Sequence, residues 1–322
     1  MVSKRYDAER PGENHLNTPV TEQLHPNAIG LDTRPLSDVA ALLAQSQALA
    51  ASAPLDAVGP ICDGAQAMAA TVRAKGVLRY LAAGSSGLMA AADALELGGT
   101  FSIPANQVQI HMAGGLPSSA EMPGDVEDIS TTLTDELAEL SVRDTLIAVS
   151  ASGTTPYTIA AARIARDKGA QVIGIANNAG SELLQLSDHA VLLETPPELV
   201  SGSTRMGAGT AQKIALNMLS TLMAVELGHI QDGMMINLRA DNDKLRARAN
   251  GIVCQLTGVD PKQAASALNI TGGDLKCAVL VAAGVGSDEA AQALLDETNG
   301  HLRPAMNRLK RNNENTNLGE AK

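Results

Sequence analysis

Aromatic side chains are scarce in this chain. It has no tryptophan, and Phe101, Tyr6, Tyr80 and Tyr157 are its only aromatic residues. Stacking platforms for nucleic-acid bases and aromatic clefts for sugar rings therefore have almost nothing to be built from. A ligand of this protein must be recognised mainly by hydrogen bonds.

Positive charge is also in short supply. The 322 residues carry 24 Lys and Arg against 35 Asp and Glu, which gives a formal net charge of -11. Such a surface does not attract nucleic acid or an anionic membrane, so neither is expected as a partner. An anionic ligand would have to be held by local groups.

The chain lacks the spacings typical of metal and redox sites. Its three cysteines, Cys62, Cys254 and Cys277, lie far apart in apolar stretches, and none of its six histidines forms an H-x-x-H pair. We expect buried thiols, no metal and no cofactor. A polar N-terminus and the absence of an apolar run of roughly 18 residues predict a cytoplasmic protein without a membrane partner.

What the chain does have is a repeated order of strand, polar loop and helix. Short apolar runs at 77–83, 108–112, 145–150, 171–175 and 190–193 predict strands, and helical spacing separates several of them. This alternation predicts an α/β fold with a doubly wound parallel sheet and helices on both faces.

The remaining segments predict additions to the sheet. A polar stretch reaches to about Pro35, and helical spacing over 36–75 is interrupted near Pro54; a long helix is expected over 209–228 and further helices over 237–306. We therefore divide the chain into an N-terminal arm and helix (1–58), the sheet domain (59–235), a small helical unit (236–306) and a disordered tail (307–322).

Polar loops follow two of the predicted strands. In a doubly wound sheet the ligand crevice lies beyond the carboxyl ends of the strands. Small hydroxyl side chains, free backbone N–H groups and a following helix N-terminus suit a phosphate there. One alternative is that these residues are only helix caps and tight turns. A dinucleotide-binding fold is the other use of such loops, but no G-x-G-x-x-G follows a predicted strand. The candidate ligand-binding residues are Gly84, Ser85, Ser86, Gly87, Ser150, Ser152, Gly153 and Thr155, with Ser203 from a third loop.

Two carboxylates lie near these loops in the sequence. Glu96 comes late in the helix after the first loop among apolar residues, which could raise its pKa. Glu127 follows the Gly114-Gly115 turn after the second strand. Taken alone, each is better explained as a solvated or capping residue than as a catalytic one.

Four stretches together carry a family resemblance. They are TEQLHPN at 21–27, GSSG at 84–87, SASGTTPY at 150–157 and SGSTRMGAGTAQK at 201–213. The Ser-x-Ser-Gly-x-Thr loop alone indicates the wide sugar isomerase (SIS) domain family, whereas the last stretch is more specific. Over about residues 21–306 the chain resembles the N-acetylmuramic acid 6-phosphate etherases, and it also resembles the related glucokinase regulatory proteins.

The resemblance implies the SIS fold, a flavodoxin-like three-layer αβα arrangement, and a homodimer whose neighbouring subunit helps complete the site. It implies a carbon–oxygen lyase that binds a phosphorylated amino sugar, uses no metal or cofactor, and expels D-lactate before water adds back. By position, Glu96 matches the acid that assists lactate departure and Glu127 the base that removes the C2 proton. Such a pair must titrate differently.

The chain departs from the family pattern at three points. It has His25 within Leu-His-Pro where Arg-Asn-Pro is usual, an altered segment at 44–50, and Gly207 where a lysine is usual. If these groups meet the lactyl carboxylate, their loss weakens its recognition. Two alternatives therefore stay open: a non-catalytic sugar-phosphate-binding regulator, and a SIS-type isomerase or lyase acting on another phosphosugar.

Overall fold

A parallel sheet forms the centre of the protein. The computed structural model describes residues 18–122, 126, 131–238 and 242–320. Within them the main sheet has five strands in the order β2-β1-β3-β4-β5, and all its pairs are parallel. This is the flavodoxin-like strand order, and it confirms the predicted doubly wound α/β fold. The strands are β1 (Leu78–Ala82), β2 (Val108–Met112), β3 (Thr145–Val149), β4 (Gln171–Ala176) and β5 (His189–Leu192).

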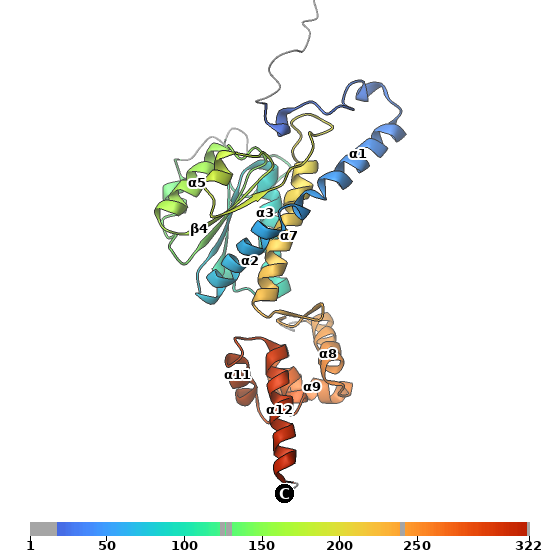
Figure 1. Cartoon of the computed structure of the whole chain (residues 1–322), viewed down its shortest axis with the longest axis vertical. Helices are drawn as coiled ribbons and strands as arrows, with labels where there is room; N and C mark the ends of the chain where they lie inside the picture. The colour runs from blue at the N-terminus through green and yellow to red at the C-terminus, as the bar shows by residue number, and fades with distance from the viewer. Residues whose placement is uncertain (1–17, 123–125, 127–130, 239–241, 321–322) are drawn as a thin grey trace, which may run out of the picture.

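Helices cover both faces of the sheet (Figure 1). Because side chains alternate along a strand, Tyr80 and Ile147 face one core while their neighbours Leu81 and Leu146 face the other. The first core is closed by α2 (Val58–Arg73), α3 (Gly84–Phe101) and α7 (Gly207–Glu226). The second is closed by α4 (Leu133–Glu136), α5 (Pro156–Asp167) and α6 (Glu182–Gln185).

The segment Gly84 to Gly87 forms the first turn of α3, whereas the sequence predicts a loop there. Ala83 is still extended, and Gly84 has a φ of 54°, so the chain turns from strand to helix at one glycine. Gly87 brings the helix close to β2, because a Cβ at this position would lie 2.9 Å from Met112 Cγ.

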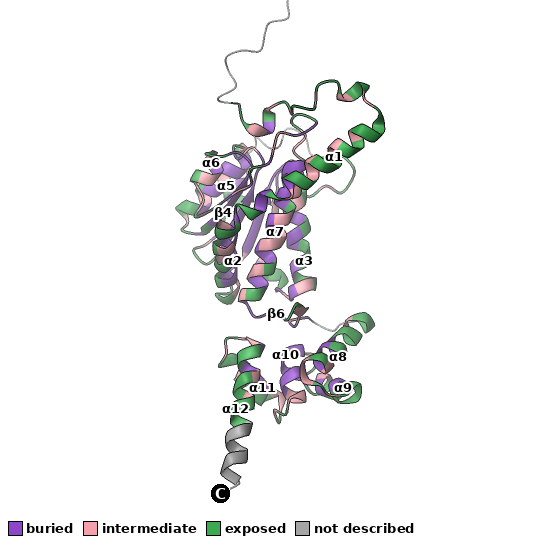
Figure 2. Cartoon of the chain, turned by 45° about the vertical axis from the view of Figure 1, so that its right-hand side comes forward, coloured by how far each residue is buried: buried purple, intermediate pink, exposed green. Residues whose placement is uncertain are grey.

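The start of the N-terminal arm is anchored to the loop after β4, and its end returns to α7 and the first core. It contains the short 3₁₀ turns Val20–Glu22, Leu31–Thr33 and Ala53–Leu55 and the helix α1 (Leu36–Ala50), so the predicted break near Pro54 is present. Thr21 is buried, and its hydroxyl accepts a hydrogen bond from Asn178 Nδ2 at 3.0 Å. Most of α1 is exposed, and it projects beyond the sheet (Figure 2).

A separate core holds the C-terminal helices together. A short hairpin of β6 (Ile230–Gln231) and β7 (Met234–Met235) leads to them. Residues from Ile236 onward form this core among themselves. Within the described ranges, no helix is both long and apolar enough to cross a membrane. The helices are α8 (Asp243–Thr257), α9 (Pro261–Ile270), α10 (Leu275–Ala282), α11 (Asp288–Asp296) and α12 (Leu302–Glu320).

Two expectations from composition differ from the structure. Helix α12 runs on to Glu320, through the segment predicted to be a disordered tail. Its first turns are anchored by buried Leu302 and Ala305, and extending an anchored helix is easier than starting one. Of the three thiols predicted to be buried, Cys277 is buried but Cys62 and Cys254 are only half-buried.

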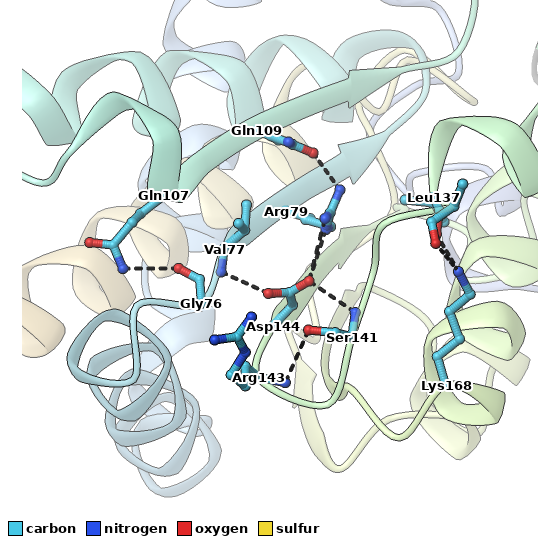
Figure 3. Close-up of polar contacts among 11 residues, drawn as sticks. Gly76, Val77, Arg79, Gln107, Gln109, Leu137, Ser141, Arg143, Asp144 and Lys168 are labelled. Carbon is cyan, nitrogen blue, oxygen red and sulfur yellow. Dashed lines mark hydrogen bonds and ion pairs between the residues drawn. The ribbon is translucent and has the colours of Figure 1, made fainter.

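A buried polar network joins the amino ends of the strands (Figure 3). The Arg79 guanidinium lies 3.3 Å from an Asp144 carboxylate oxygen, and both side chains are almost fully buried. The Asp144 carboxylate also accepts from the N–H groups of Val77 at 2.8 Å and Ser141 at 3.0 Å. These hydrogen bonds satisfy a buried ion pair and tie the start of β1 to the turn before β3. The opposite, carboxyl edge of the sheet is where the polar loops lie.

Candidate functional site

The first two polar segments begin side by side at the carboxyl edge of the sheet. Ala82 of β1 and Val149 of β3 are register partners, so Ser86 and Ser150 follow adjacent strands. After β1 the chain crosses the first face through α3, and after β3 it crosses the other face through α5. Adjacent strands whose connections leave to opposite faces form the crevice in which such folds bind ligands.

Hydrogen bonds among hydroxyl groups shape the second loop. Ser150 Oγ lies 2.8 Å from Thr155 Oγ1 and 3.3 Å from Ser152 Oγ, and it accepts from Gly153 N at 3.0 Å. Thr155 is the N-cap residue of α5, yet its side chain makes no capping bond to that helix. The positive end of α5 is therefore left for a ligand, with a cluster of hydroxyl donors beside it.

Gly153 sits at a turn that only glycine fits. Its φ is 70°, and a Cβ there would lie 2.2 Å from Ser181 Oγ. The loop is also held by Asn178, whose Nδ2 donates to Ser152 O at 3.2 Å. Asn178 is not among the residues predicted from the sequence to belong to the site, and its Nδ2 also donates to the Thr21 hydroxyl. The change from apolar to polar residues at the end of β4 is the signal that could have found Asn178.

The first loop offers a second free helix N-terminus. Ser86 is buried, Gly84 and Ser85 are half-buried, and no side chain caps α3. The serines at the start of α3 follow one strand, and the hydroxyls before α5 follow its neighbour. Two uncapped helix ends therefore lie next to these hydroxyl groups. This arrangement suits an anion such as a phosphate, without requiring lysine or arginine.

The third loop differs from the other two. Ser203 is half-buried in a turn in which its N–H donates to Val200 O at 2.9 Å. The following helix α7 is capped by Glu198, whose carboxylate accepts from Gly207 N and Ala208 N at 2.9 Å each. That helix end already holds an anion. The start of α7 is therefore not a second phosphate position.

Of the two glutamates predicted to be catalytic, the structure describes only one. Glu127 lies outside the described residues. Glu96 lies on the exposed side of α3, and at a rise of 1.5 Å per residue it is roughly 15 Å along the helix from Ser86. The apolar surroundings expected around Glu96 are therefore not provided by its own chain.

The buried acid on α3 is Asp93, one turn before Glu96. Its carboxylate accepts from Tyr80 Oη at 2.9 Å, Asn217 Nδ2 at 2.8 Å and Ser220 Oγ at 2.9 Å. Burial raises the pKa of Asp93, although these three donors oppose the shift. Asp93 thus ties α3 to β1 and α7, and it fixes the part of the helix that presents Glu96.

A cavity of about 560 Å³ lies beside the loops, on the α5 face of β2. The Glu136 carboxylate is on its wall and accepts from Tyr157 Oη at 2.8 Å and Thr132 Oγ1 at 2.6 Å. His111 Nδ1 is 3.9 Å from Glu136 Oε2, and burial, with the nearby charge of Arg79, lowers the pKa of His111. The other lining residues are Ile110, Met112, Gly114, Gly115, Leu116 and Val126.

Two of the departures from the family pattern meet in space. A Cβ on Gly207 would lie 3.2 Å from Ala50 Cβ, and the Thr210 hydroxyl is 2.5 Å from the Gln47 side-chain amide. The altered segment 44–50 thus packs on the start of α7. The third departure, His25, lies in the arm, where its Nδ1 accepts from Asn27 N at 3.0 Å.

Metal ligands are not grouped in the part of the chain that the structure describes. No set of three or more His, Cys, Asp or Glu side chains there could hold a metal ion. The anion-binding groups of the site are hydroxyls and helix ends.

Comparison with known proteins assigns the chain to a family. The family model described as SIS domain matches residues 112–226. A Deinococcus radiodurans protein named N-acetylmuramic acid 6-phosphate etherase is 41% identical over 289 residues, covering 89% of this chain and 94% of that protein. Proteins of the same name from Rubrobacter xylanophilus and Streptomyces coelicolor are 37% and 38% identical, covering 93% and 91% of this chain and 99% and 95% of their own lengths. Because these similarities extend over nearly the whole of each chain, the protein belongs to the N-acetylmuramic acid 6-phosphate etherase family.

Proposed function

We propose that this protein is a carbon–oxygen lyase that cleaves the D-lactyl ether of N-acetylmuramic acid 6-phosphate. The products are D-lactate and N-acetylglucosamine 6-phosphate. The observation that carries the proposal is the pair of hydroxyl-rich segments on adjacent strands, in a chain whose full-length relatives bear this name. A regulator without catalysis is not favoured by those names.

The phosphate would bind where the two uncapped helix ends converge. Ser85 and Ser86 at the start of α3, with Ser150, Ser152 and Thr155 before α5, supply hydroxyl donors for its oxygens. Gly84, Gly87 and Gly153 allow the backbone to come close, and Ser203 adds a hydroxyl from the third loop. Anchoring the phosphate fixes the position of C2 and C3 relative to the acid and base.

The chemistry requires one base and one acid. Ring opening places an aldehyde next to C2, which makes the C2 proton removable. We assign Glu127 as the base that takes this proton; the electron pair then forms a C2–C3 double bond as the C3–O ether bond breaks. Glu96 as a carboxylic acid gives its proton to the departing lactate oxygen. Water then adds across the double bond, with its oxygen at C3 and a proton at C2.

The position of Glu96 supports a homodimer. A hexose 6-phosphate held at Ser86 is too short to reach a side chain roughly 15 Å further along α3. Glu96 instead lies on an exposed helix face with Leu88 and Leu95, whose exposures are 37% and 68%. We infer that this face packs against a second copy of the chain, so that Glu96 of one copy serves the phosphate loops of the other.

The experiment that tests the reaction is proton NMR of the protein with N-acetylmuramic acid 6-phosphate in D₂O. Loss of the C2 proton signal together with free lactate is the expected result, and Glu96→Gln should abolish lactate release. Binding of the substrate without either change would refute the lyase and favour the regulator. Exchange of the C2 proton without release of lactate would instead indicate a SIS-type isomerase.

Complementation tests the shared site. Co-expressed Glu96→Gln and Ser150→Ala/Ser152→Ala chains should form mixed dimers with one intact site each, and recover roughly a quarter of wild-type activity. Each variant alone should be inactive, and no recovery in the mixture would argue against a shared site.

We also propose the cytoplasm as the place of action, because a charged sugar phosphate does not cross the apolar part of a membrane unaided.

A further inference from the structure

One residue of the N-terminal arm is buried next to the second polar loop, residues 150–155. Thr21 is 4% exposed, although Thr18 and Glu22 on either side of it are exposed. Its partner is Asn178, in the segment that follows β4, and Asn178 is 7% exposed. Two buried polar side chains that satisfy each other fix the arm to the sheet domain at this point.

The Asn178 side chain uses both ends of its amide for the connection. Its Oδ1 accepts from Thr21 N at 3.4 Å, and its Nδ2 donates to Thr21 Oγ1 at 3.0 Å and to Ser152 O at 3.2 Å. These partners fix the orientation of the amide, because Ser152 O can only accept and Thr21 N can only donate. Asn178 therefore joins the arm to the main chain of the second loop.

The bond to Ser152 O sets the direction of a donor on the other side of the same peptide group. The peptide is trans, so its carbonyl oxygen and its N–H point in opposite directions. That N–H belongs to Gly153 and donates to Ser150 Oγ at 3.0 Å. Holding the Ser152 carbonyl toward Asn178 thus holds the Gly153 N–H toward the hydroxyl cluster.

The Gly153 N–H determines how the Ser150 hydroxyl can be used. A hydroxyl has one proton to donate and accepts with its lone pairs. Because Gly153 N already donates to Ser150 Oγ, the proton of that hydroxyl is directed to a different acceptor. A phosphate oxygen beside Ser150 and Thr155 would be such an acceptor, and hydrogen bonds in a chain strengthen one another.

We propose that Thr21 is a positioning residue for phosphosugar binding. Through Asn178 it keeps the second loop in the shape that presents hydroxyl donors to the phosphate, a role that rests on the proposed function because it takes this loop as the phosphate site. Coupling of this kind is reciprocal, so a bound phosphosugar holds the arm more firmly on the loop. The N-terminal arm thereby contributes to affinity through the loop.

Calorimetric titration with N-acetylglucosamine 6-phosphate tests the role of the Thr21 hydroxyl. Thr21→Val keeps the shape of the side chain but removes the acceptor of Asn178 Nδ2, so the affinity should fall roughly three-fold to ten-fold, up to the worth of one hydrogen bond. Thr21→Ser keeps the hydroxyl and should bind within about two-fold of wild type. The matched control is Thr18→Val, at an exposed threonine of the same arm, which should bind like wild type.

A double substitution tests whether the effect passes through Asn178. Asn178→Ala should lower the affinity at least as much as Thr21→Val, because it also frees Ser152 O. Adding Thr21→Val to Asn178→Ala should cause no further loss, since both residues act through the same amide. Additive losses would overturn the proposed route.

Proteolysis measures the coupling in the other direction. Glu22 is exposed, and a glutamate-specific protease cleaves after it when the arm around Thr21 opens. Saturating N-acetylglucosamine 6-phosphate should slow this cleavage in the wild-type protein by roughly the factor that Thr21→Val costs in affinity. It should slow cleavage less in Thr21→Val. A role in stability alone would leave the cleavage rate independent of the ligand.

The outcomes separate this proposal from the reaction. A folded Thr21→Val protein that binds like wild type, or equal losses of affinity in Thr21→Val and Thr21→Ser, overturns the role of the Thr21 hydroxyl. Lack of lactate release by the wild-type protein, with affinity still sensitive to Thr21, overturns the lyase and leaves the positioning residue standing. Failure of the wild-type protein to bind the sugar phosphate overturns the phosphate site and this proposal with it.

Discussion

The buried carboxylate of Glu198 accepts a hydrogen bond from the backbone N–H of Gly207 at 2.9 Å. Ala208 donates to the other oxygen at the same distance. A Cβ on Gly207 would lie 3.2 Å from both the Glu198 carboxylate and Ala50 Cβ. The absence of a side chain at 207 therefore leaves room both for Ala50 of the altered segment 44–50 and for the Glu198 carboxylate that caps α7.

Removing the Glu198 carboxylate should destabilise the protein. Glu198→Ala leaves two buried N–H groups without partners at the positive end of α7, so the free energy of unfolding should fall by about 2 to 4 kcal/mol. Glu198→Gln keeps one acceptor oxygen and should cost less. Urea denaturation measures both, and Glu194→Ala, at an exposed glutamate nearby, is the control. Equal stability of the Glu198→Ala and Glu194→Ala variants would contradict this role.

Asp93 should matter for stability and for the lyase step. Asp93→Ala leaves Tyr80, Asn217 and Ser220 without their shared acceptor, and a loss of about 3 kcal/mol in the free energy of unfolding is expected. The Ser220→Ala variant loses one donor and should cost about 1 kcal/mol. Lactate release should be measured at a temperature where both variants are folded. It should fall more for Asp93→Ala, because this substitution removes the hydrogen bonds that hold the part of α3 carrying Glu96. Equal rates would show that Asp93 does not position that helix.

Local patterns predicted most of the sheet and its loops. Runs such as 145–150 and 171–175 are short, apolar and bounded by turn residues, and both are strands within a residue or two of those limits. The order of these strands in the sheet is not encoded in any local pattern. The positions of Ser86 and Ser150 followed from the rule that ligands bind at the carboxyl edge, which needs only the βα order.

Long-range placement could not be predicted in the same way. The sequence places Asp93 and Glu96 in one apolar stretch, and only packing on α7 decides that Asp93 is buried and Glu96 exposed. No local sequence pattern predicts that Glu198 caps α7. Its partners, Gly207 and Ala208, come several residues later in the chain, and only the intervening turn brings them to the carboxylate.

His229 should make stability fall in mild acid. Burial, and then the charge of Lys276, lowers the pKa of His229 to about 3. Between the ordinary value near 6.5 and about 3, the unfolded chain binds a proton that the folded chain does not. The free energy of unfolding therefore falls with decreasing pH, by up to about 1.4 kcal/mol per pH unit, and is unaffected above pH 7.

Urea denaturation at pH 7 and pH 5 measures this slope. The His229→Gln variant should show a smaller difference between the two pH values than wild type, though not none, because the lowered pKa of His111 acts in the same direction. His25→Gln, in the N-terminal arm, is the control and should keep the wild-type slope. The same slope in His229→Gln as in wild type would show that another group is responsible.

Gly153 and Gly180 form a matched pair that separates backbone strain from steric conflict in the phosphate loop. Both have a positive φ, 70° and 68°, but a Cβ on Gly153 would lie 2.2 Å from Ser181 Oγ, whereas a Cβ on Gly180 meets nothing within 4 Å. Gly180→Ala should therefore cost only the strain of a left-handed residue, about 1 to 2 kcal/mol. Gly153→Ala should cost a further 1 to 3 kcal/mol, roughly, because Ser181 must move. It should also weaken phosphosugar binding, since Gly153 N donates to Ser150 Oγ. Calorimetric titration with N-acetylglucosamine 6-phosphate measures the affinity, and unaltered binding by a folded Gly153→Ala protein would place the phosphate away from this loop.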